Sequence, residues 1–212
     1  MKITRLVRSV HNTEKIAIYI DSKYTFSVLE SIVISESLYV GKEITKEELR
    51  RLEDLAKYKL LKQKLLNVIS IRPRSEREIR NYLVKKKAIN FTDELIDELK
   101  REGIIDDLGF ANWWIQQRRT FSKKSIREVQ KELFLKGISR EIIQQAEIEN
   151  KDDLVELDSA LNLLQKKKGL LVSKNLNEEL LNEKLKIFLT RKGFSWEIIH
   201  AAFDRLKDET NY

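Results

Sequence analysis

The same short segment occurs twice in the second half of the chain, and this internal repeat restricts the possible folds more than any other feature. Residues 136–146 and 192–202 are identical at seven of eleven positions, and the two copies are 56 residues apart. Self-similarity at a fixed period is the signature of stacked structural repeats. A unit this short cannot bury its own apolar stripe, so we expect neighbouring units to share one continuous core.

Each copy contains the end of one helix and the beginning of the next. Gly137 and Gly193 can adopt the left-handed backbone conformation that ends a helix. Ser139 and Ser195 follow two residues later and can cap the N-terminus of the next helix. Because an amphipathic helix is also predicted before each copy, each unit is expected to contain three helices.

A more diverged copy lies upstream of these two. The sequence Ser-Glu-Arg-Glu at 75–78 fits a capping box, and Ser-Ile-Arg-Glu repeats the pattern 50 residues later at 125–128. We therefore predict three tandem three-helix repeats, over residues 58–107, 108–150 and 151–212.

The N-terminal region follows a different pattern. Within residues 1–44, isoleucines alternate with other residues from 16 to 20, and a second β-branched and aromatic stretch follows a short turn. This pattern predicts a β-hairpin or a three-stranded β segment. A capping box at Thr45 begins a charged connecting helix over residues 45–57. The apolar pattern from 46 to 70 fits either one long helix or two helices with a bend near Tyr58.

The composition agrees with a mainly α fold. Charged residues make up 35% of the chain and hydrophobic residues 42%, which indicates a large exposed helical surface. An elongated crescent of stacked repeats accommodates this many charges more readily than a compact sphere does. With six glycines and one proline, the chain offers few places where helices must break.

The cellular setting is inferred from what the sequence lacks. The chain has no cysteine, which excludes disulfides and favours a cytoplasmic location. No run approaches 18 apolar residues, so we expect no association with a membrane. The formal net charge of +7 favours anionic partners, such as nucleic acid or an acidic protein surface.

Enzymatic activity is not expected. His11 and His200 are far apart in the sequence, and neither has a second metal ligand at a suitable spacing. The chain contains neither a phosphate-binding G-x-x-x-x-G-K-[ST] loop nor a G-x-S-x-G nucleophile elbow. Asp106 and Asp107 fit the N-cap and first turn of a helix better than a metal site. We therefore predict no catalytic residues, no metal and no cofactor.

Five short motifs occur in an order that resembles the RecX family. They are residues 72–83, residues 103–107, Phe110-Ala111 with Trp114 and Arg118, residues 122–124, and Leu133 with Lys136-Gly137-Ile138. The likeness covers nearly the whole chain. It departs from the family pattern at Leu108-Gly109, where the family tends to have charged residues.

The resemblance implies a regulatory protein rather than an enzyme. It implies a crescent of tandem three-helix units that binds in the groove of the RecA recombinase filament, where it limits filament growth or promotes disassembly. It also implies contact with DNA. A crescent with capped ends is expected to be a monomer.

Charge alternates along the predicted repeats. The net charge is +9 over residues 57–91, −5 over 92–107, +6 over 108–140 and −6 over 141–158. Stacked repeats would therefore present one basic ridge and one acidic ridge. The candidate partner-binding or DNA-binding cations are Arg72, Arg74, Arg77, Arg80, Lys85, Lys86, Lys87, Arg118, Arg119, Lys123, Lys124, Arg127 and Lys131.

These cations suit two kinds of partner. They could pair with acidic residues of a protein filament, which the family resemblance favours. Alternatively, they could hold the phosphates of single- or double-stranded DNA, weakly and without sequence preference. Trp113 is a further candidate, because Trp114 shares a register with Phe110 and is expected in the core. Trp113 could be an exposed anchor or could pack against a neighbouring unit.

Overall fold

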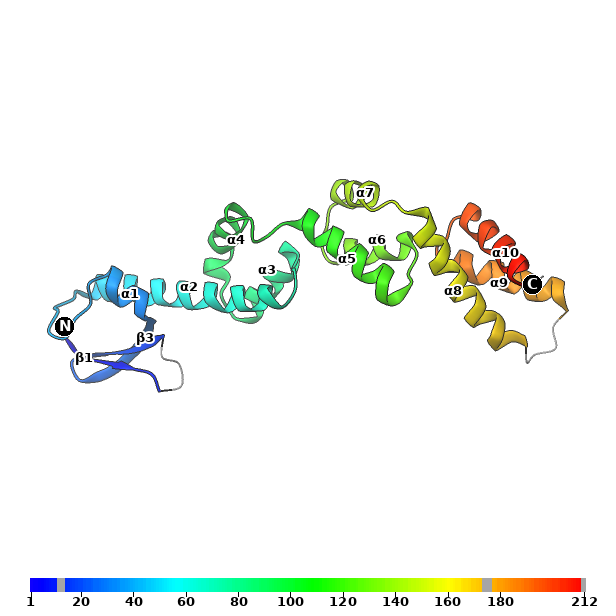
Figure 1. Cartoon of the computed structure of the whole chain (residues 1–212). Helices are drawn as coiled ribbons and strands as arrows, with labels where there is room; N and C mark the ends of the chain where they lie inside the picture. Colours follow the sequence, from blue (N-terminus) through cyan, green and yellow to red (C-terminus); the bar gives the residue numbers. More distant parts are fainter. Residues whose placement is uncertain (11–13, 173–176, 211–212) are drawn as a thin grey trace. The chain divides into compact units, whose positions relative to one another are not determined.

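The computed structural model describes residues 1–10, 14–172 and 177–210. The chain forms two compact units, Met1–Arg72 and Pro73–Tyr212 (Figure 1). The first contains a three-stranded antiparallel sheet and two helices, and the second is helical throughout its described part. The predicted fold class, mainly α with a small N-terminal β segment, is confirmed.

The sheet of the first unit is a meander in the order β1-β2-β3. Its strands are β1 (Ile3–Arg8), β2 (Lys15–Ile20) and β3 (Lys23–Leu29). Asp21 and Ser22 join β2 to β3 and both have positive φ angles, 47° and 66°. This geometry matches a tight hairpin turn whose twist follows that of the strands.

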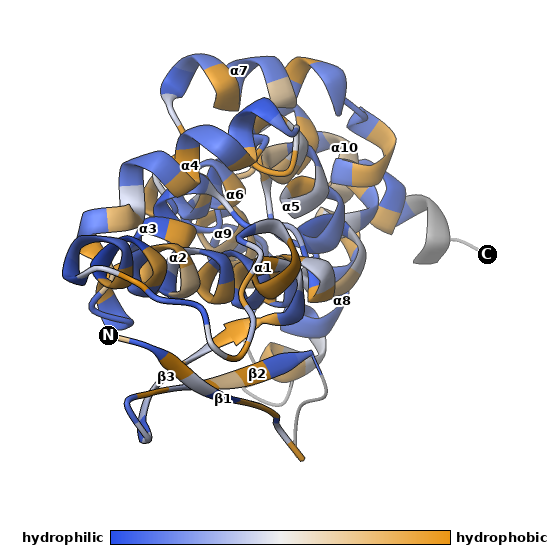
Figure 2. Ribbon diagram, turned by 90° about the vertical axis from the view of Figure 1, so that its left-hand side faces the viewer, coloured by the Kyte–Doolittle hydropathy of each residue, from blue (hydrophilic) through white to orange (hydrophobic). Residues whose placement is uncertain are grey.

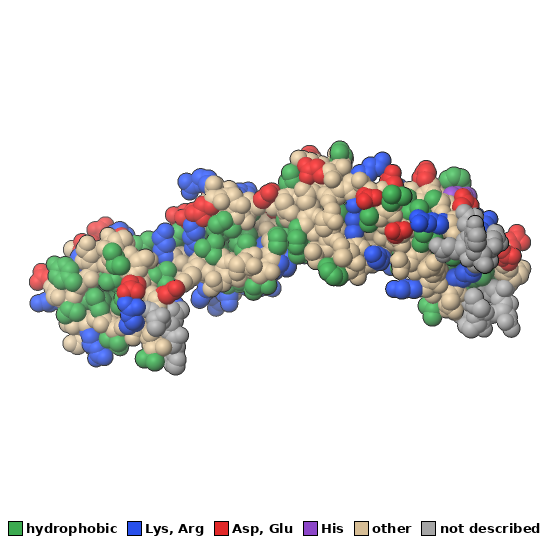
Figure 3. Space-filling model, in the orientation of Figure 1, with side chains coloured by type: hydrophobic (Ala, Val, Ile, Leu, Met, Phe, Trp, Pro, Cys, Tyr) green, Lys and Arg blue, Asp and Glu red, His purple; other side chains and the backbone are tan. Residues whose placement is uncertain are grey.

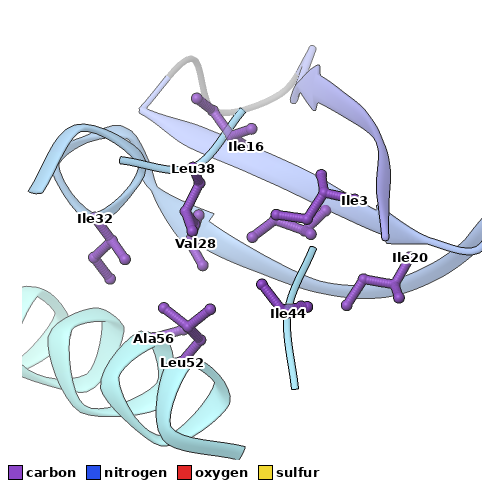
Figure 4. Packing of buried hydrophobic residues seen from close by; sticks show 10 residues of the cluster. Ile3, Ile16, Ile20, Val28, Ile32, Leu38, Ile44, Leu52 and Ala56 are labelled. Carbon is purple, nitrogen blue, oxygen red and sulfur yellow. The ribbon is translucent and has the colours of Figure 1, made fainter. Parts of the chain in front are cut away.

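One face of the sheet carries the core of the first unit. Ile16, Ile18 and Ile20 are buried at alternate positions of β2, as the period-2 pattern predicted. Helices α1 (Glu30–Ser35) and α2 (Lys46–Ile71) cover this face. Figure 4 shows side chains from both helices directed toward the sheet, with Ile32, Leu52 and Ala56 grouped beside Val28.

Helix α2 is a single helix of 26 residues, so the first of the two alternatives is the observed one. Its capping box forms as predicted: the Thr45 hydroxyl accepts a hydrogen bond from the Glu48 amide at 3.1 Å, and the Glu48 carboxylate accepts one from the Thr45 amide at 2.7 Å. Buried residues continue at helical spacing through Tyr58 to Leu65, which explains why no bend occurs there.

The second unit contains eight α-helices and a 3₁₀ turn in its described part. The bounds are α3 (Glu76–Lys85), the 3₁₀ turn (Ile89–Phe91), α4 (Thr92–Arg101), α5 (Asp107–Ser122), α6 (Ile126–Leu135), α7 (Arg140–Glu149), α8 (Asp153–Val172), α9 (Glu178–Arg191) and α10 (Trp196–Thr210). Helices α5 to α7 enclose one buried cluster and α8 to α10 enclose another. Hydrophobic and hydrophilic bands alternate along the helices in Figure 2, which agrees with one buried and one exposed side.

The same helix end follows α3, α6 and α9, and it also follows α4, where Gly103 has a φ of 68° and the Ile104 amide bonds the Leu99 carbonyl at 2.9 Å. After α3, α6 and α9, a backbone amide bonds the carbonyl five residues earlier: Ala88 to Leu83 at 3.0 Å, Ile138 to Leu133 at 3.1 Å, and Phe194 to Leu189 at 3.2 Å. The residue before each of these amides has a positive φ: 56° at Lys87, 86° at Gly137 and 88° at Gly193. The diverged first copy thus keeps the helix stop but has lysine where the others have glycine.

Candidate interaction surface

The N-terminus of α3 packs against the end of α6, and the N-terminus of α6 packs in the same way against the end of α9. The Ser75 hydroxyl caps α3 by accepting from the Glu78 amide at 3.2 Å, and it also donates to the Lys136 carbonyl at 2.8 Å. Ser125 accepts from the Glu128 amide at 3.3 Å and donates to the Lys192 carbonyl at 2.6 Å. Both serines are fully buried. We call these two contacts the repeat junctions.

Each repeat junction also contains an ion pair. Lys136 Nζ lies 2.7 Å from Glu78 Oε1 at the first junction. Lys192 Nζ lies 3.5 Å from Glu128 Oε1 at the second. The Lys136–Glu78 pair is about four-fifths buried on both sides, so it is shielded from solvent more than a surface pair is.

A carboxylate from the following three-helix group completes each repeat junction. Asp107 Oδ1 accepts from the Glu76 amide at 2.9 Å, and Glu156 Oε1 accepts from the Ile126 amide at 3.5 Å. These amides belong to the first turns of α3 and α6, where the helix dipole favours negative charge. Burial nevertheless raises the pKa of both Asp107 and Glu156 above the ordinary value.

The glycines of the repeated segment serve the junctions as well as the helix ends. A Cβ on Gly137 would lie 2.6 Å from both Cβ and Cδ of Arg77, and a Cβ on Gly193 would lie 3.1 Å from Cβ of Arg127. The aliphatic stems of these two arginines therefore occupy the space that a side chain would need. From the sequence, Gly137 and Gly193 were predicted only to end a helix, and their close approach to the arginines was not predicted.

Several of the cations predicted to bind a partner form ion pairs or hydrogen bonds within the chain instead. Arg80 joins α3 to α4, with Nε 2.6 Å from Glu76 and Nη1 2.7 Å from Asp93. Lys100 also pairs with Glu76, at 2.5 Å. Burial opposes the ionisation of Glu76, but the hydrogen bonds from Lys100 and Arg80 outweigh it and lower the pKa of Glu76.

A second group of cations surrounds Glu132 of α6. Its carboxylate accepts hydrogen bonds from Trp114 Nε1 at 2.8 Å, from Arg118 Nε at 2.6 Å and from the Lys124 ammonium. The Arg118 guanidinium lies 4.1 Å from the centre of the Trp114 ring, and so does Lys136 Nζ. Burial raises the pKa of Glu132, but the hydrogen bonds from these three residues outweigh it and lower the pKa overall.

Arg119 and Trp113 both lie against the core of α5 to α7. Arg119 is only 9% exposed, and its guanidinium donates to the carbonyl of Asn150. Trp113 is half-buried beside Phe110, with ring centroids 6.0 Å apart, and it packs within its own three-helix group. Of the two alternatives for Trp113, packing fits this half-buried position better than an exposed anchor does.

The remaining candidate cations differ in exposure. Arg72, Arg74 and Lys123 are half-buried, and Nε of Arg74 is buried with no hydrogen-bond partner among the described residues. The exposed candidates are Arg77, Lys85, Lys86, Lys87, Arg127 and Lys131. On the face shown in Figure 3, Lys and Arg side chains are interspersed with Asp and Glu side chains within each unit.

Two kinds of site are absent from the described part of the chain. Over residues 1–10, 14–172 and 177–210, no three His, Asp or Glu side chains gather to form a metal site. His11 lies outside this part, and His200 packs against the ring of Trp196. Nor does any helix here combine the length and the apolar character needed to span a bilayer.

Two family models match the chain. One, described as "RecX, second three-helix domain", matches residues 106–146. The other, described as "Regulatory protein RecX N-terminal domain", matches residues 1–45. The first match covers all of α5 and α6 and most of α7, and the second covers the sheet, α1 and the cap of α2.

Relatives extend this likeness over nearly the whole chain. A regulatory protein RecX from Bacillus pumilus (strain SAFR-032) is 34% identical over 209 residues, covering 97% of this chain and 78% of the relative. One from Clostridium beijerinckii is 29% identical over 207 residues, covering 97% and 95% respectively.

Two solved structures share the fold. A crystal structure of regulatory protein RecX matches with a TM-score of 0.75 and 24% identity, over 96% of this chain and 98% of that one. RecX from Lactobacillus salivarius matches with a TM-score of 0.62 and 22% identity, over 71% and 96%.

Proposed function

The chain belongs to the RecX family of regulatory proteins, and from this premise we propose that it binds filaments of the RecA recombinase and inhibits their growth. This activity acts in DNA recombination, DNA repair and the SOS response, inside the cytoplasm. The observation that carries the proposal is the likeness to proteins named regulatory protein RecX along nearly the whole chain.

The architecture of the second unit suits a filament as the partner. Stacked helical repeats contact only their neighbours and expose a long continuous side, which helical-repeat proteins use for binding. The repeat junctions fix how the successive helical groups stack through a buried serine, an ion pair and a carboxylate each. This stacking supports binding along several recombinase subunits at once.

The exposed cations are the residues that we propose meet the filament. Arg77, Lys85 and Lys87 on and after α3, with Arg127 and Lys131 on α6, carry their charge at the surface. Arg80, Arg118, Arg119 and Lys124 hold the fold together instead. Exposed charges contribute only about 0–1 kcal/mol each to stability, so they are free to serve recognition.

The test is hydrolysis of ATP by RecA on single-stranded DNA while this protein is added. A protein that blocks extension at a filament end acts on many subunits, so hydrolysis is expected to fall at substoichiometric amounts. A protein with the charges of Lys85, Lys86 and Lys87 reversed to Glu serves as the matched variant and is expected to inhibit less. Unchanged hydrolysis at an equimolar ratio of the native protein contradicts the proposal.

A second candidate function is direct binding to DNA. The observation that favours it is the run Lys85-Lys86-Lys87, three consecutive exposed lysines at the end of α3. Contacts of this kind bind phosphates without reading bases and weaken steeply with salt. In this alternative the protein acts on DNA in the absence of recombinase.

A further inference from the structure

The surface between α6 and α7 contains an apolar groove that the repeat architecture does not account for. Its volume is about 490 Å³, and its lining includes Phe134 and Leu135 from α6 and Ile143 from α7. Phe134 is 57% exposed and Leu135 is 75% exposed, whereas Ile143 is buried beneath them. Figure 1 shows α6 and α7 within the second unit.

Phe134 and Leu135 do not belong to the apolar stripe of their own helix. That stripe consists of Val129 and Leu133, which are buried in the core of α5 to α7. Successive helical residues are about 100° apart, so Phe134 and Leu135 point away from the stripe. Two large exposed apolar residues beside a groove are typical of a surface that binds another molecule.

The rim of the groove is positive. Lys131 and Arg140 line it, and neither makes an ion pair with another described residue. Hydrogen bonds from its own backbone amide and from Ser139 lower the pKa of the neighbouring Glu141, and the charge of Arg140 lowers it further. Beside the groove, Gln130 of α6 donates a hydrogen bond 2.6 Å long to the Glu147 carboxylate of α7.

The residues that line the groove are not repeated in the third three-helix group. At the positions 56 residues later, Lys131, Phe134, Leu135 and Arg140 are replaced by Ile187, Thr190, Arg191 and Trp196. The shared parts of the repeat, the glycine and the capping serine, are kept in both copies. The lining of the groove is therefore not a requirement of the repeated helix stop and cap.

We propose that the α6–α7 groove is a docking site for an acidic amphipathic helix of a protein partner. Apolar side chains on one face of that helix pack on Phe134 and Leu135, and its Asp or Glu side chains pair with Lys131 and Arg140. The proposal goes beyond the regulatory role proposed above and does not require the partner to be RecA.

Charge and polarity argue for this occupant over two others. A second copy of this chain would bring Lys131 and Arg140 of both copies together, which like-charge repulsion disfavours. Single-stranded nucleic acid would satisfy the cations but would leave Leu135 and Ile143 without apolar partners. An acidic amphipathic helix satisfies both the cations and the apolar floor.

The experiment is a selection from a displayed library of short random peptides on the full-length protein, followed by affinity measurements. The most enriched peptide is synthesised with a fluorophore and used as the probe. Enriched peptides are expected to carry Leu, Phe or Trp at i, i+3 or i+4 spacing among Asp and Glu residues. Enrichment of peptides without acidic residues overturns the proposal.

Variants locate the probe. Phe134→Ala, Leu135→Asp and the double variant Lys131→Glu/Arg140→Glu are each expected to weaken probe binding by about tenfold or more. The controls are Phe121→Ala, another exposed aromatic residue, and Lys166→Glu/Arg191→Glu, which reverses two exposed cations of the third group. The controls are expected to change affinity by less than about twofold.

Three further outcomes overturn the proposal. In the first, the probe binds the Phe134 and Leu135 variants as tightly as the native protein. In the second, the native protein forms a dimer that Phe134→Ala dissolves, which assigns the groove to a second copy. In the third, a single-stranded oligonucleotide displaces the probe and loses affinity in the Lys131/Arg140 variant but not in the Phe134 variant. Thermal unfolding of each variant verifies that it is folded.

Discussion

Lys87 occupies the position that glycine holds in the other two repeats, and it adopts the same left-handed backbone. A non-glycine residue in this conformation is strained, because its Cβ approaches the carbonyl oxygen. Lys87 is exposed and makes no ion pair with a described residue, so its side chain does not offset the strain.

Replacing Lys87 with Gly is therefore expected to stabilise the protein by about 1 kcal/mol. The free energy of unfolding in urea measures the effect. Lys86→Gly is the matched control, because Lys86 has a φ of −86° and gains nothing from glycine. Equal changes in the two variants would contradict the strain at Lys87.

Individual capping residues were predictable from the sequence, but their second contacts were not. Residues 75–78 and 125–128 were predicted as capping boxes, and the serine of each caps its helix. The glutamates of the two boxes, Glu78 and Glu128, pair with lysines at the repeat junctions. The bonds of the two serines to the carbonyls of Lys136 and Lys192 join positions 61 and 67 residues away. A local pattern predicts a cap because the cap satisfies neighbouring amides, but it says nothing about distant carbonyls.

The pairing of charges was also missed, for the same reason. Arg118 and Lys124 looked like exposed helix cations in the sequence, yet both bind Glu132. In the sequence, Glu132 lies at an ordinary polar position of the helical pattern. Two features of the sequence point to Glu132 as the shared partner. Trp114 is expected in the core, where its indole N–H requires a hydrogen-bond acceptor, and there are few acidic residues between positions 108 and 140.

The Glu132 contacts predict how stability depends on pH. The pKa of Glu132 is lowered from its usual value of 4.5, so its carboxylate stabilises the fold above about pH 4.5 and loses that contribution as the pH falls further. Glu132→Gln is expected to cost about 1–3 kcal/mol at pH 7 and much less at pH 3.5 to 4. Asp107 and Glu156 act in the opposite sense, because their raised pKa values favour protonation in the folded state.

Urea unfolding of the native protein and Glu132→Gln at several pH values measures this dependence. Glu141→Gln is the control on an exposed helix terminus: its lowered pKa comes from backbone and Ser139 hydrogen bonds in solvent. A gap between native protein and Glu132→Gln that stays constant down to pH 3.5 would be incompatible with the Glu132 cluster.

Among the helices, α3 and α6 have N-termini that do more than begin a helix. Their first turns hold the repeat junctions, so each helix start is also a contact between helical groups. α7 begins with the same Ser cap, in which Ser139 accepts from the Ile142 amide at 3.3 Å, but this serine is exposed and bonds to no other helical group in the described part of the chain. The two kinds of cap allow the junction to be measured separately from the capping.

Ser75→Ala is expected to destabilise the protein by about 2–3 kcal/mol, because it removes the cap and takes the hydrogen bond of Ser75 from the partly buried Lys136 carbonyl. Ser139→Ala removes only a cap and is expected to cost about 1 kcal/mol. Chemical denaturation of the two variants gives both values. If Ser75→Ala costs no more than Ser139→Ala, the junction bond contributes nothing.

For the whole molecule, the sequence was sufficient to predict the architecture but not the way its parts join. The mainly α class, the N-terminal β segment and the repeated helix stops follow from periodicity and capping signals, which are local. The choice between one helix and two at residues 46–71 was left open, since a continuous apolar stripe is compatible with both until its neighbours are known. Which cations remain exposed likewise depends on contacts between groups.

The exposed cations are also expected to determine how tightly the protein binds its partner. Reversal of Lys85, Lys86 and Lys87 to Glu is expected to weaken binding to a polyanionic partner with little change in the unfolding temperature, because exposed charges add at most about 1 kcal/mol each to stability. Glu94→Lys/Asp97→Lys on α4 is the matched control, since both acids are exposed.

Co-sedimentation with RecA filaments on single-stranded DNA, compared with the same DNA alone at physiological salt, measures whether the protein binds the filament itself. The native protein is expected to pellet with filaments and to stay in solution with bare DNA. The Lys85/Lys86/Lys87 variant is expected to pellet less, and the Glu94/Asp97 variant as much as the native protein. If the native protein pellets equally with filaments and with bare DNA, or with neither, it is not a RecA filament regulator.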